Sequence, residues 1–295
     1  MSVRDDGAGV RACWDGAELF RYVYRPDDPP LESPRPYLHP VRTLAGNLVT
    51  DFSPGDHRWH KGISWSLPNV GAENFWGGPT YRSGDGYVQL DNNGAMRHDS
   101  FDAIDAADGR ASLTEQLTWV TAVGDTLFTE RRQITAAAAP GRPAWNLTFG
   151  TAMRIVGGRS VAIGSPTTEG RENAGYGGLF WRGPASFAGG RVLTPDGAGG
   201  DEIMGWRGPW LAFATPAATL IFRDSPANPG HPCQWFVRST PYACACPAPF
   251  FAAEVPVAAG AELTLSYQVV VADGELDIGA CGALFNEALF EEAFF

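Results

Sequence analysis

The sequence lacks any apolar run long enough to cross a membrane as a helix, and its first ten residues, MSVRDDGAGV, contain no apolar signal core. It also lacks an excess of positive charge, because 22 Lys and Arg face 33 Asp and Glu for a formal net charge of −11. Contacts to phosphate backbones need a clustered basic surface. We therefore expect a cytoplasmic protein that binds neither nucleic acid nor a membrane.

Lysine is scarce, since Lys61 is the only one among the 22 basic residues. It follows His60 directly in the sequence GDHRWHKG. Lys differs from Arg in its hydration and in the ease with which its pKa shifts. Its place beside a histidine is therefore either chance or a sign that an amine is needed there.

Paired cysteines are missing as well. The five cysteines have neither the spacing of a disulfide framework nor that of paired zinc knuckles. Cys244 and Cys246 lie two residues apart, which places both on one face of a strand, so a shared soft metal is one interpretation. Small buried core thiols are the favoured interpretation, because free Cys packs like a small hydrophobe.

Helical spacing is rare, and strand-like patterns dominate. Alternating or branched apolar segments recur to about residue 272, and the 36 Gly and 23 Pro are scattered among them as turn residues. The run TEQLTWVTAVGDTLFTERRQIT predicts two strands joined at residues 123–125 as a hairpin. Only residues 277–295 have helical spacing. On one face of that helix we expect Leu284, Phe285, Ala288, Leu289 and Phe295.

These patterns predict an all-β protein with one domain over residues 1–295. Hydrophobic residues make up 44% of the chain and charged residues 19%, which allows a sizeable core, and no linker divides the sequence. Many strands and one late helix favour a β-supersandwich of two large antiparallel sheets, with the short C-terminal helix capping a sheet. A jelly roll and a pair of smaller sandwiches are the alternatives. An apolar sheet face is compatible with a homodimer.

Polar and aromatic side chains gather in three irregular stretches, residues 32–81, 167–184 and 223–238. The first includes a loop at residues 55–62, which begins at Gly55 after Pro54 and ends at Gly62. The candidate residues are Arg35, Tyr37, His39, Arg42, Asp56, His57, Trp59, His60, Lys61, Asn74 and Trp76 in the first stretch, Glu169, Arg171, Glu172, Asn173, Tyr176 and Arg182 in the second, and Asp224, Asn228, His231, Trp235 and Arg238 in the third.

These residue types suit a sugar or sugar-acid site. Histidine near a carboxylate moves protons near neutral pH, because imidazole titrates there and the carboxylate fixes its tautomer. Arg side chains and aromatic faces hold hydroxyl and carboxylate groups by forked hydrogen bonds and stacking. By contrast, we expect His98, in a predicted strand, to be structural, and Trp65 and Trp119 to lie in the core.

A metal is the alternative use of the histidines. His57 and His60 are three residues apart, and with His39 as a third ligand they would form a divalent-metal site in which Asp56 ligates or supports a ligand. No HExxH motif or similar pattern fixes this arrangement. The sequence therefore assigns no cofactor, and a divalent metal at His39, His57 and His60 stays open as the alternative.

Four blocks of the sequence, PRPYLHPVRTLAGNLVT, DHRWHKGISW, NFWGG and NPGHPCQWFVR, resemble a bacterial family often labelled "methane oxygenase PmoA" and otherwise of unknown function. The resemblance extends from about Tyr22 to about Phe251. It implies a galactose-mutarotase-like supersandwich and a link to sugar metabolism. The site residues that it implies are His39, Arg42, Asp56, His57 and His60. The segment CACPAPF departs from the family's pattern and implies a different pocket floor.

An oxygenase activity does not follow from that label. Membrane methane oxygenase is built on transmembrane helices, and this sequence has no segment able to span a bilayer. The resemblance therefore supports a role in sugar metabolism and not alkane oxidation.

The leading functional hypothesis is a carbohydrate-active enzyme, epimerase-, lyase- or hydrolase-like, in which His57 and His60 transfer protons. His39 and Asp56 complete the candidate catalytic set, although Glu169 and Asp224 are also candidate carboxylate partners. The candidate substrate-binding residues are Arg35, Arg42, Lys61, Trp59, Asn74, Trp76, Arg182, His231, Trp235 and Arg238. We expect residues 55–62 to form one wall of a pocket and residues 224–238 the opposite wall.

Two other classes of function remain open at this point. One is a non-catalytic carbohydrate-binding protein or a partner of an oxidoreductase, which would use the same stacking residues without turnover. The other is a His-ligated metal-dependent oxygenase or hydrolase.

Overall fold

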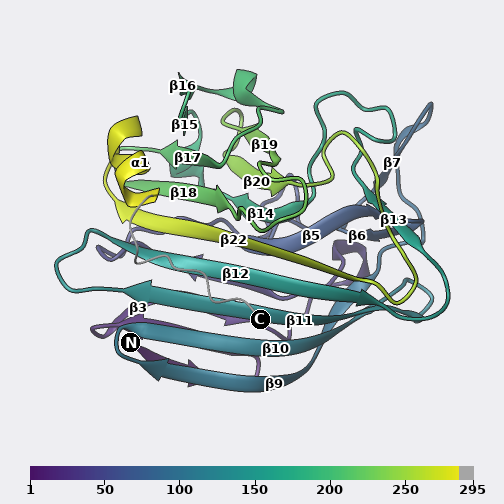
Figure 1. Cartoon of the computed structure of the whole chain (residues 1–295), viewed down its shortest axis with the longest axis horizontal. Coiled ribbons are helices and arrows are strands. Elements are labelled where there is room, and N and C mark those ends of the chain that lie inside the picture. The colour runs from purple at the N-terminus through teal and green to yellow at the C-terminus, as the bar shows by residue number, and fades with distance from the viewer. Residues whose placement is uncertain (286–295) are drawn as a thin grey trace.

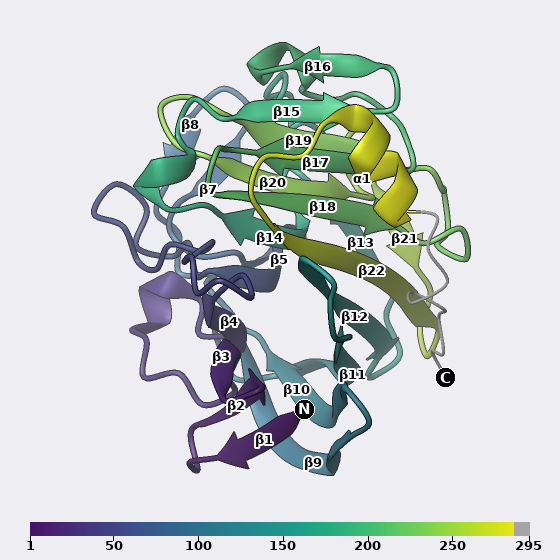
Figure 2. The ribbon, with the colours of Figure 1, turned by 90° about the vertical axis from the view of Figure 1, so that its left-hand side faces the viewer.

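In the computed structural model, which describes residues 1–285, two large antiparallel sheets pack face to face, and a two-stranded sheet stands apart from them (Figure 1). Figure 2 shows the N-terminal strands β1 to β4 and the strands β9 to β12 on opposite sides of the interior. The predicted all-β supersandwich of large antiparallel sheets with a short C-terminal helix is therefore confirmed.

The first sheet is 11-stranded, and its path ends at β19. In spatial order it contains β1 (Ser2–Asp5), β2 (Gly9–Trp14), β3 (Ala17–Val23), β4 (Tyr37–Val41), β5 (Ile63–Val70), β14 (Gly178–Arg182), β20 (Cys244–Ala248) and β19 (Gln234–Arg238), with β6 (Glu73–Phe75), β13 (Val161–Gly164) and β21 (Val255–Val257) joined as a branch at β5.

The second sheet is 9-stranded and holds the longest strands. In spatial order it contains β16 (Gly197–Gly199), β15 (Arg191–Thr194), β17 (Trp210–Ala214), β18 (Ala218–Asp224), β22 (Glu262–Asp273), β12 (Ala144–Ile155), β11 (Thr126–Ala138), β10 (Arg110–Val120) and β9 (Ala95–Ala107). The remaining elements are the two-stranded sheet β7 (Thr80–Arg82) and β8 (Gly86–Val88), the 3₁₀ turns η1 (Pro30–Glu32), η2 (Ala185–Phe187) and η3 (Asp201–Ile203), and the helix α1 (Ile278–Phe285).

The core lies between the two sheets, because successive side chains of a strand point to opposite faces. Trp65 on β5 stacks against Phe149 on β12 and Tyr267 on β22, with ring centroids 5.9 and 6.1 Å apart. Trp65 and Trp119 are both 0% exposed, so their predicted core positions are confirmed. Large aromatic side chains contribute much of the buried apolar area that stabilises such a sandwich.

The predicted hairpin is also confirmed. Strands β10 and β11 pair from Arg110 with Ala137 to Val120 with Thr126, and the turn at residues 121–125 joins them. The C-terminal helix occupies only Ile278–Phe285 of the predicted 277–295. Leu284 and Phe285 pack against a buried cluster on the outer face of the 9-stranded sheet, whereas Ala288, Leu289 and Phe295 lie outside the described residues.

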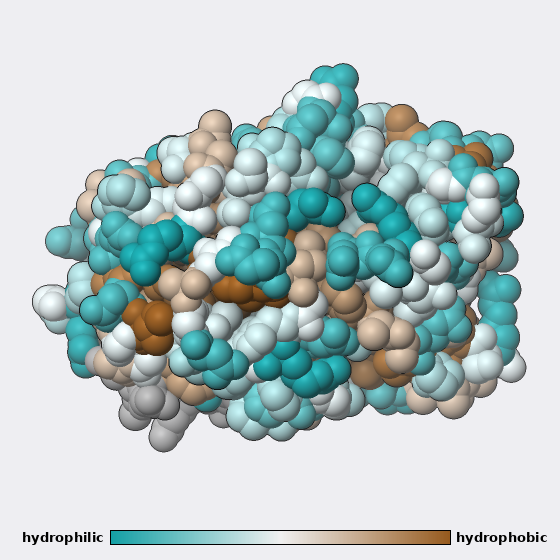
Figure 3. Space-filling model, turned by 90° about the horizontal axis from the view of Figure 1, so that it is seen from above, coloured by the Kyte–Doolittle hydropathy of each residue, from teal (hydrophilic) through white to brown (hydrophobic). Residues whose placement is uncertain are grey.

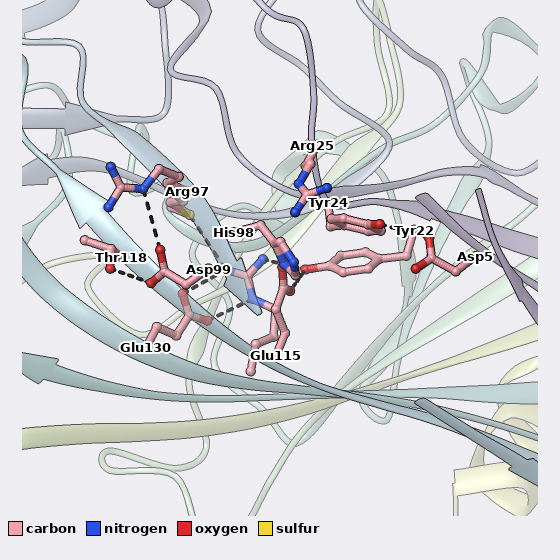
Figure 4. A network of polar contacts seen from close by, with 12 residues as sticks. Asp5, Tyr22, Tyr24, Arg25, Arg97, His98, Asp99, Glu115, Thr118 and Glu130 are labelled. Carbon is pink, nitrogen blue, oxygen red and sulfur yellow. Dashed lines mark hydrogen bonds and ion pairs between the residues drawn. The ribbon is translucent and has the colours of Figure 1, made fainter. Parts of the chain in front are cut away.

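Figure 4 shows a network of polar side chains, part of which is buried between the sheets. We call Tyr22, His98, Glu115, Glu130 and Arg132 the interior cluster. Tyr22 donates its hydroxyl hydrogen to Glu115, and His98 Nδ1 lies 2.7 Å from Glu115 Oε1. Arg132 donates to Glu130 at 2.8 and 2.9 Å, and both of these residues are 1% exposed. The predicted structural role of His98 is confirmed, because its ring serves a buried carboxylate.

On the face seen in Figure 3, hydrophobic residues occur in patches between polar ones, as on most globular surfaces. Within residues 1–285, no helix has both the length and the apolar character needed to cross a membrane.

Candidate functional site

A cavity of about 480 Å³ lies on the outer face of the 11-stranded sheet, away from the core. The strand alternation creates this face: along β19, Trp235 and Val237 join the core, so Phe236 and Arg238 point outward. The lining residues are His57, Trp59, His60, Trp76, Pro79, Tyr87, Arg171, Tyr176, Phe180, Phe236, Arg238, Tyr242 and Cys244.

The histidine loop is fixed to the sheet at both ends. Asp51 N–H donates to Arg182 O at 2.9 Å, and Arg182 N–H donates to Gly62 O at 2.8 Å. Gly62 has φ of +50°, and a Cβ at this position would lie 2.1 Å from Leu38 O. Only glycine fits such a position without moving the neighbouring strand. The glycine that ends the loop thus holds the two histidines over the sheet.

Arg35 and Lys61 support the loop from behind. Arg35 Nη2 donates to Trp59 O at 2.6 Å, while Lys61 Nζ pairs with Asp28 at 2.9 Å and with Glu32. Both side chains are 1% exposed and neither lines the cavity. Burial lowers the pKa of Arg35 to about 10. The two cations that we predicted to bind substrate are therefore used to hold the loop.

Asn74 has a similar supporting role in the NFWGG turn. Its Oδ1 accepts hydrogen bonds from the N–H groups of Trp76 and Gly77 at 2.8 and 2.9 Å. The ring of Trp59 lies so close that a Cβ on Gly78 would come within 2.7 Å of it. The turn thereby places Trp76 in the cavity wall beside Trp59, while Asn74 itself is 1% exposed and does not line the cavity.

Four polar side chains meet at the base of the histidine loop, and we call Asp56, His57, His60 and Arg182 the His57 cluster. His57 Nδ1 lies 2.9 Å from Asp56 Oδ2, and the rings of His57 and His60 stack with centroids 4.6 Å apart. Arg182 donates to both carboxylate oxygens of Asp56 at 3.2 Å and to His60 Nδ1 at 3.1 Å. Arg182, predicted to bind substrate, lies behind the two imidazoles and orients them.

The protonation states of this cluster follow from its donors. Arg182 only donates, so His60 Nδ1 must be the unprotonated acceptor. Burial, together with the charge of Arg182 and with that of His57 when it is protonated, holds the pKa of His60 well below its ordinary value. Partial burial works to raise the pKa of Asp56, but the hydrogen bond from His57 and the charge of Arg182 outweigh it and keep that pKa below the usual range. Asp56 is thus ionised and His60 neutral.

His57 is the residue with a ring nitrogen left for chemistry. Donation from its Nδ1 to Asp56 leaves Nε2 as an acceptor, and Nε2 has no hydrogen-bond partner among residues 1–285. The side chain is 33% exposed and lines the cavity. Of the three candidate carboxylates, the structure pairs Asp56 with this histidine. Asp224 is occupied elsewhere, because it accepts from His231 Nδ1 at 2.8 Å.

His39 does not join the other two histidines. Its Nδ1 lies 3.0 Å from Thr50 Oγ1, its ring stacks on Phe52, and burial lowers its pKa. Across the described part of the chain, no three His, Cys, Asp or Glu side chains are grouped so that they could hold a metal ion. The predicted metal set of His39, His57 and His60 is therefore not assembled, because the His39 ring is held by Thr50 and Phe52 and not beside the other two imidazoles.

Three further predicted residues lie outside the cavity wall. Arg42 donates to Gly46 O at 3.2 Å, and His231 is held by Asp224 as described above. Trp235 is 0% exposed, with its indole N–H donated to Gly208 O at 2.8 Å. From the predicted opposite wall, the structure brings Arg238 and the neighbouring Phe236 to the cavity.

The two closely spaced cysteines belong to a buried cluster under the cavity floor. Cys244 and Cys246 are both free thiols on the outward face of β20, beside Phe180 and Phe236. Burial raises the pKa of Cys246 to about 12 and that of Cys244 further. The favoured interpretation of these residues as small buried thiols is confirmed.

Tyr242 is the most informative residue that the sequence did not single out. Its ring packs under the Arg182 guanidinium, 3.8 Å from the centroid, and burial raises its pKa to about 12. The same ring lines a second, smaller cavity of about 220 Å³ that contains Asp51, Asp56 and Arg182. Tyr242 thus separates two hollows of the surface.

At the mouth, the small sheet of β7 and β8 contributes Tyr87. Its hydroxyl lies 2.8 Å from the hydroxyl of Tyr176 and accepts a hydrogen bond from Arg171. Arg171 and Tyr176 belong to the second polar stretch of the sequence, whereas Tyr87 has no neighbours in sequence that mark it as a site residue. The three side chains form a polar edge around the opening.

Comparison with known proteins adds a family and a distant structural likeness. The model of a family of unknown function, DUF6807, matches residues 10–286. Among solved structures, the alpha-galactosidase from Lactobacillus brevis is similar with 9% identity and a TM-score of 0.41, over 93% of this chain and 39% of that one. The chain thus spans less than half the length of that enzyme. No curated protein matches significantly, and no match supports the methane oxygenase label.

Proposed function

The chain belongs to the DUF6807 family of unknown function, and we propose that it is a carbohydrate-active enzyme in which His57 transfers a proton to or from a sugar. The observation that carries this proposal is the Asp56–His57 pair, whose remaining imidazole nitrogen has no partner among residues 1–285 while the side chain lines the cavity. The sugar metabolism implied by the sequence resemblance agrees with it.

The cavity has the size and lining for a small polyhydroxylated ligand. Its volume of about 480 Å³ is within the range of about 300–1,000 Å³ that is usual for small-molecule sites. Trp59, Trp76 and Tyr242 offer aromatic faces for the C–H face of a sugar ring. Hydroxyl, guanidinium and imidazole groups stand between these rings and can pair with sugar hydroxyls.

Each member of the His57 cluster then has a defined task. His57 Nε2 accepts the proton, and ionised Asp56 holds the tautomer and stabilises the imidazolium that forms. Arg182 fixes Asp56 and donates to Nδ1 of His60, so the Nε2–H of His60, which burial keeps neutral, can donate to a ligand oxygen. Tyr242, with its pKa raised to about 12 by burial, keeps its hydroxyl hydrogen as a second donor.

The lining favours epimerisation or elimination over glycoside hydrolysis. Glycosidases commonly flank the scissile bond with two carboxyl groups. No Asp or Glu is among the residues of the described chain that line this cavity. Proton transfer by an imidazole at a carbon or hydroxyl of the sugar uses the groups that are present.

The test is deuterium exchange. The purified protein is incubated with neutral sugars and sugar acids in D₂O, and loss of a C–H signal is followed by proton NMR. We expect exchange or product formation with one class of sugar, and His57→Gln should slow it by about 10²- to 10⁴-fold while calorimetric ligand affinity is largely retained.

The matched control is His231→Gln, which alters another Asp-paired histidine outside the cavity and should leave the exchange rate unchanged. Sugar binding without any exchange or turnover would instead identify a non-catalytic carbohydrate-binding protein. An exchange rate that survives in His57→Gln would remove His57 from the mechanism.

A further inference from the structure

We infer that the ligand of this cavity is a sugar acid whose carboxylate is bound by Arg171 and Arg238, an inference that rests on the proposed carbohydrate function. The two guanidinium groups stand in a wall that contains no carboxylate, although the protein as a whole is acidic.

The charged side chains of the cavity wall are of one sign. The ionisable residues that line the cavity are Arg171, Arg238, two histidines, tyrosines and a cysteine, with no Asp or Glu among the described lining residues. The chain as a whole has 33 acidic against 22 basic residues. A local excess of positive charge in an acidic protein concentrates anions at that place.

Arg238 has no acceptor for its charge. Its side chain is half-buried, and within residues 1–285 the guanidinium makes no hydrogen bond or ion pair, only a contact 5.7 Å from the ring of Phe236. A partly desolvated cation without an anion is unfavourable. Arg132, by contrast, is buried with Glu130. An anion that enters the cavity would give Arg238 the charged partner that it lacks among residues 1–285.

Arg171 is in a comparable position at the mouth. It donates to Tyr87, and its guanidinium lies 4.9 Å from the centroid of that ring. The residues that hold it are neutral, so its charge is also uncompensated in the described chain. Guanidinium groups bind carboxylates through two parallel hydrogen bonds, which selects both the charge and the plane of the ligand group.

A carboxylate fits the chemistry of His57 better than a phosphate ester does. A proton on the carbon next to a carboxylate can be removed by His57 Nε2, and the electron pair of the broken C–H bond moves into the carboxylate as an enediolate. The nearby guanidinium groups stabilise the added negative charge. A proton from water then adds to the opposite face of that carbon, which restores the carboxylate and inverts the centre, and His57 releases the proton that it took to water. A phosphate ester would be bound without making any carbon acidic.

Isothermal titration calorimetry tests this with five probes: D-galacturonate, D-glucuronate, D-galactose, D-glucose and D-glucose 6-phosphate. We expect at least one uronate to bind about tenfold or more tightly than its neutral counterpart. Arg238→Gln should abolish that difference, and Arg171→Gln should reduce it. Arg154→Gln, in which an exposed arginine outside the cavity is changed, should leave it intact.

The outcomes separate the two proposals. If neutral sugars bind as tightly as uronates and Arg238→Gln has no effect on either, the sugar-acid inference fails while the carbohydrate function stands. Tighter binding of glucose 6-phosphate than of both uronates overturns the choice of a carboxylate. If none of the five probes binds, the carbohydrate function fails and takes this inference with it.

Discussion

Two regions of this protein contain the same set of side chains, a histidine, a carboxylate and an arginine, and use them differently. In the His57 cluster, His57 lies 2.9 Å from Asp56, and their side chains are 33% and 46% exposed. In the interior cluster, His98 lies 2.7 Å from Glu115, and their side chains are 4% and 1% exposed. The hydrogen-bond geometry is nearly the same, and the access to solvent differs.

The difference lies in what remains unpaired. In the interior cluster the carboxylates are met by Tyr22, His98 and Arg132, so the charges are compensated within the sandwich (Figure 4). In the cavity, His57 keeps a free ring nitrogen and Arg238 has no anion in the described chain. Buried polar groups stabilise a fold when all of them are satisfied. Groups that are left unsatisfied at a cavity wall are available to a ligand.

The largest effect that tests this contrast is expected for Arg132→Met. The change leaves Glu130 without its buried cation and removes a donor to Tyr22. Breaking a buried ion pair by removal of one partner typically costs about 3–5 kcal/mol of unfolding free energy. Urea denaturation would measure the loss, and D₂O exchange per folded molecule should stay at the wild-type rate. A loss below about 1 kcal/mol would show that the interior cluster is not a closed structural unit.

A matched pair of histidine variants gives the next largest contrast. His98→Gln weakens the hydrogen bonding of a buried carboxylate, and we expect a loss of about 1–3 kcal/mol in unfolding free energy. His57→Gln changes a side chain that is 33% exposed, and its unfolding free energy should stay within about 0.5 kcal/mol of the wild type. Denaturation curves of both variants, measured side by side with exchange rates, should show opposite patterns. Equal stability losses would contradict the division between the two regions.

The smallest effect concerns pH and His60. Because burial holds the folded-state pKa of His60 well below 6.5, the unfolded chain binds a proton at this site below pH 6.5 that the folded chain does not bind. This histidine therefore favours unfolding as the pH falls below 6.5, and its effect is absent above that pH. Below pH 6.5, the contribution of His60 to the change of unfolding free energy with pH approaches about 1.4 kcal/mol per pH unit.

The measurement is the unfolding free energy of the wild type and of His60→Gln between pH 5 and 8. The variant should have the flatter curve below pH 6.5, and the two curves should run parallel above it. Parallel curves over the whole range would mean that His60 is not held neutral by its surroundings.

The sequence predicted the fold well because strand alternation and turn residues are local signals. The hairpin of β10 and β11, the late helix α1 and the core positions of Trp65 and Trp119 all follow from patterns of a few residues. The loop at residues 55–62 was also identifiable, since two histidines between glycine breaks are a local feature.

The wall of the site was harder to predict. Contacts with distant segments decide which side chains are buried and which alternate side chains of a strand face the core. Arg35 and Lys61 look like ligand-binding cations in the sequence, but carbonyl groups and carboxylates from other segments enclose them. Trp235 and Phe236 are adjacent aromatic residues, and nothing in the sequence shows which of the two faces the core. The partner strand β20 decides this, and it places Phe236 on the cavity side.

The position of the Tyr242 ring has a consequence for the length of the ligand. One side chain stands between a hollow of about 480 Å³ and another of about 220 Å³. If a sugar binds in the larger hollow as proposed, the ring is a barrier on that side and would restrict the ligand to single rings or to the ends of chains. Replacement of this tyrosine by a small residue would join the two hollows and admit a longer saccharide. The size class of the ligand is therefore open to change through a single codon.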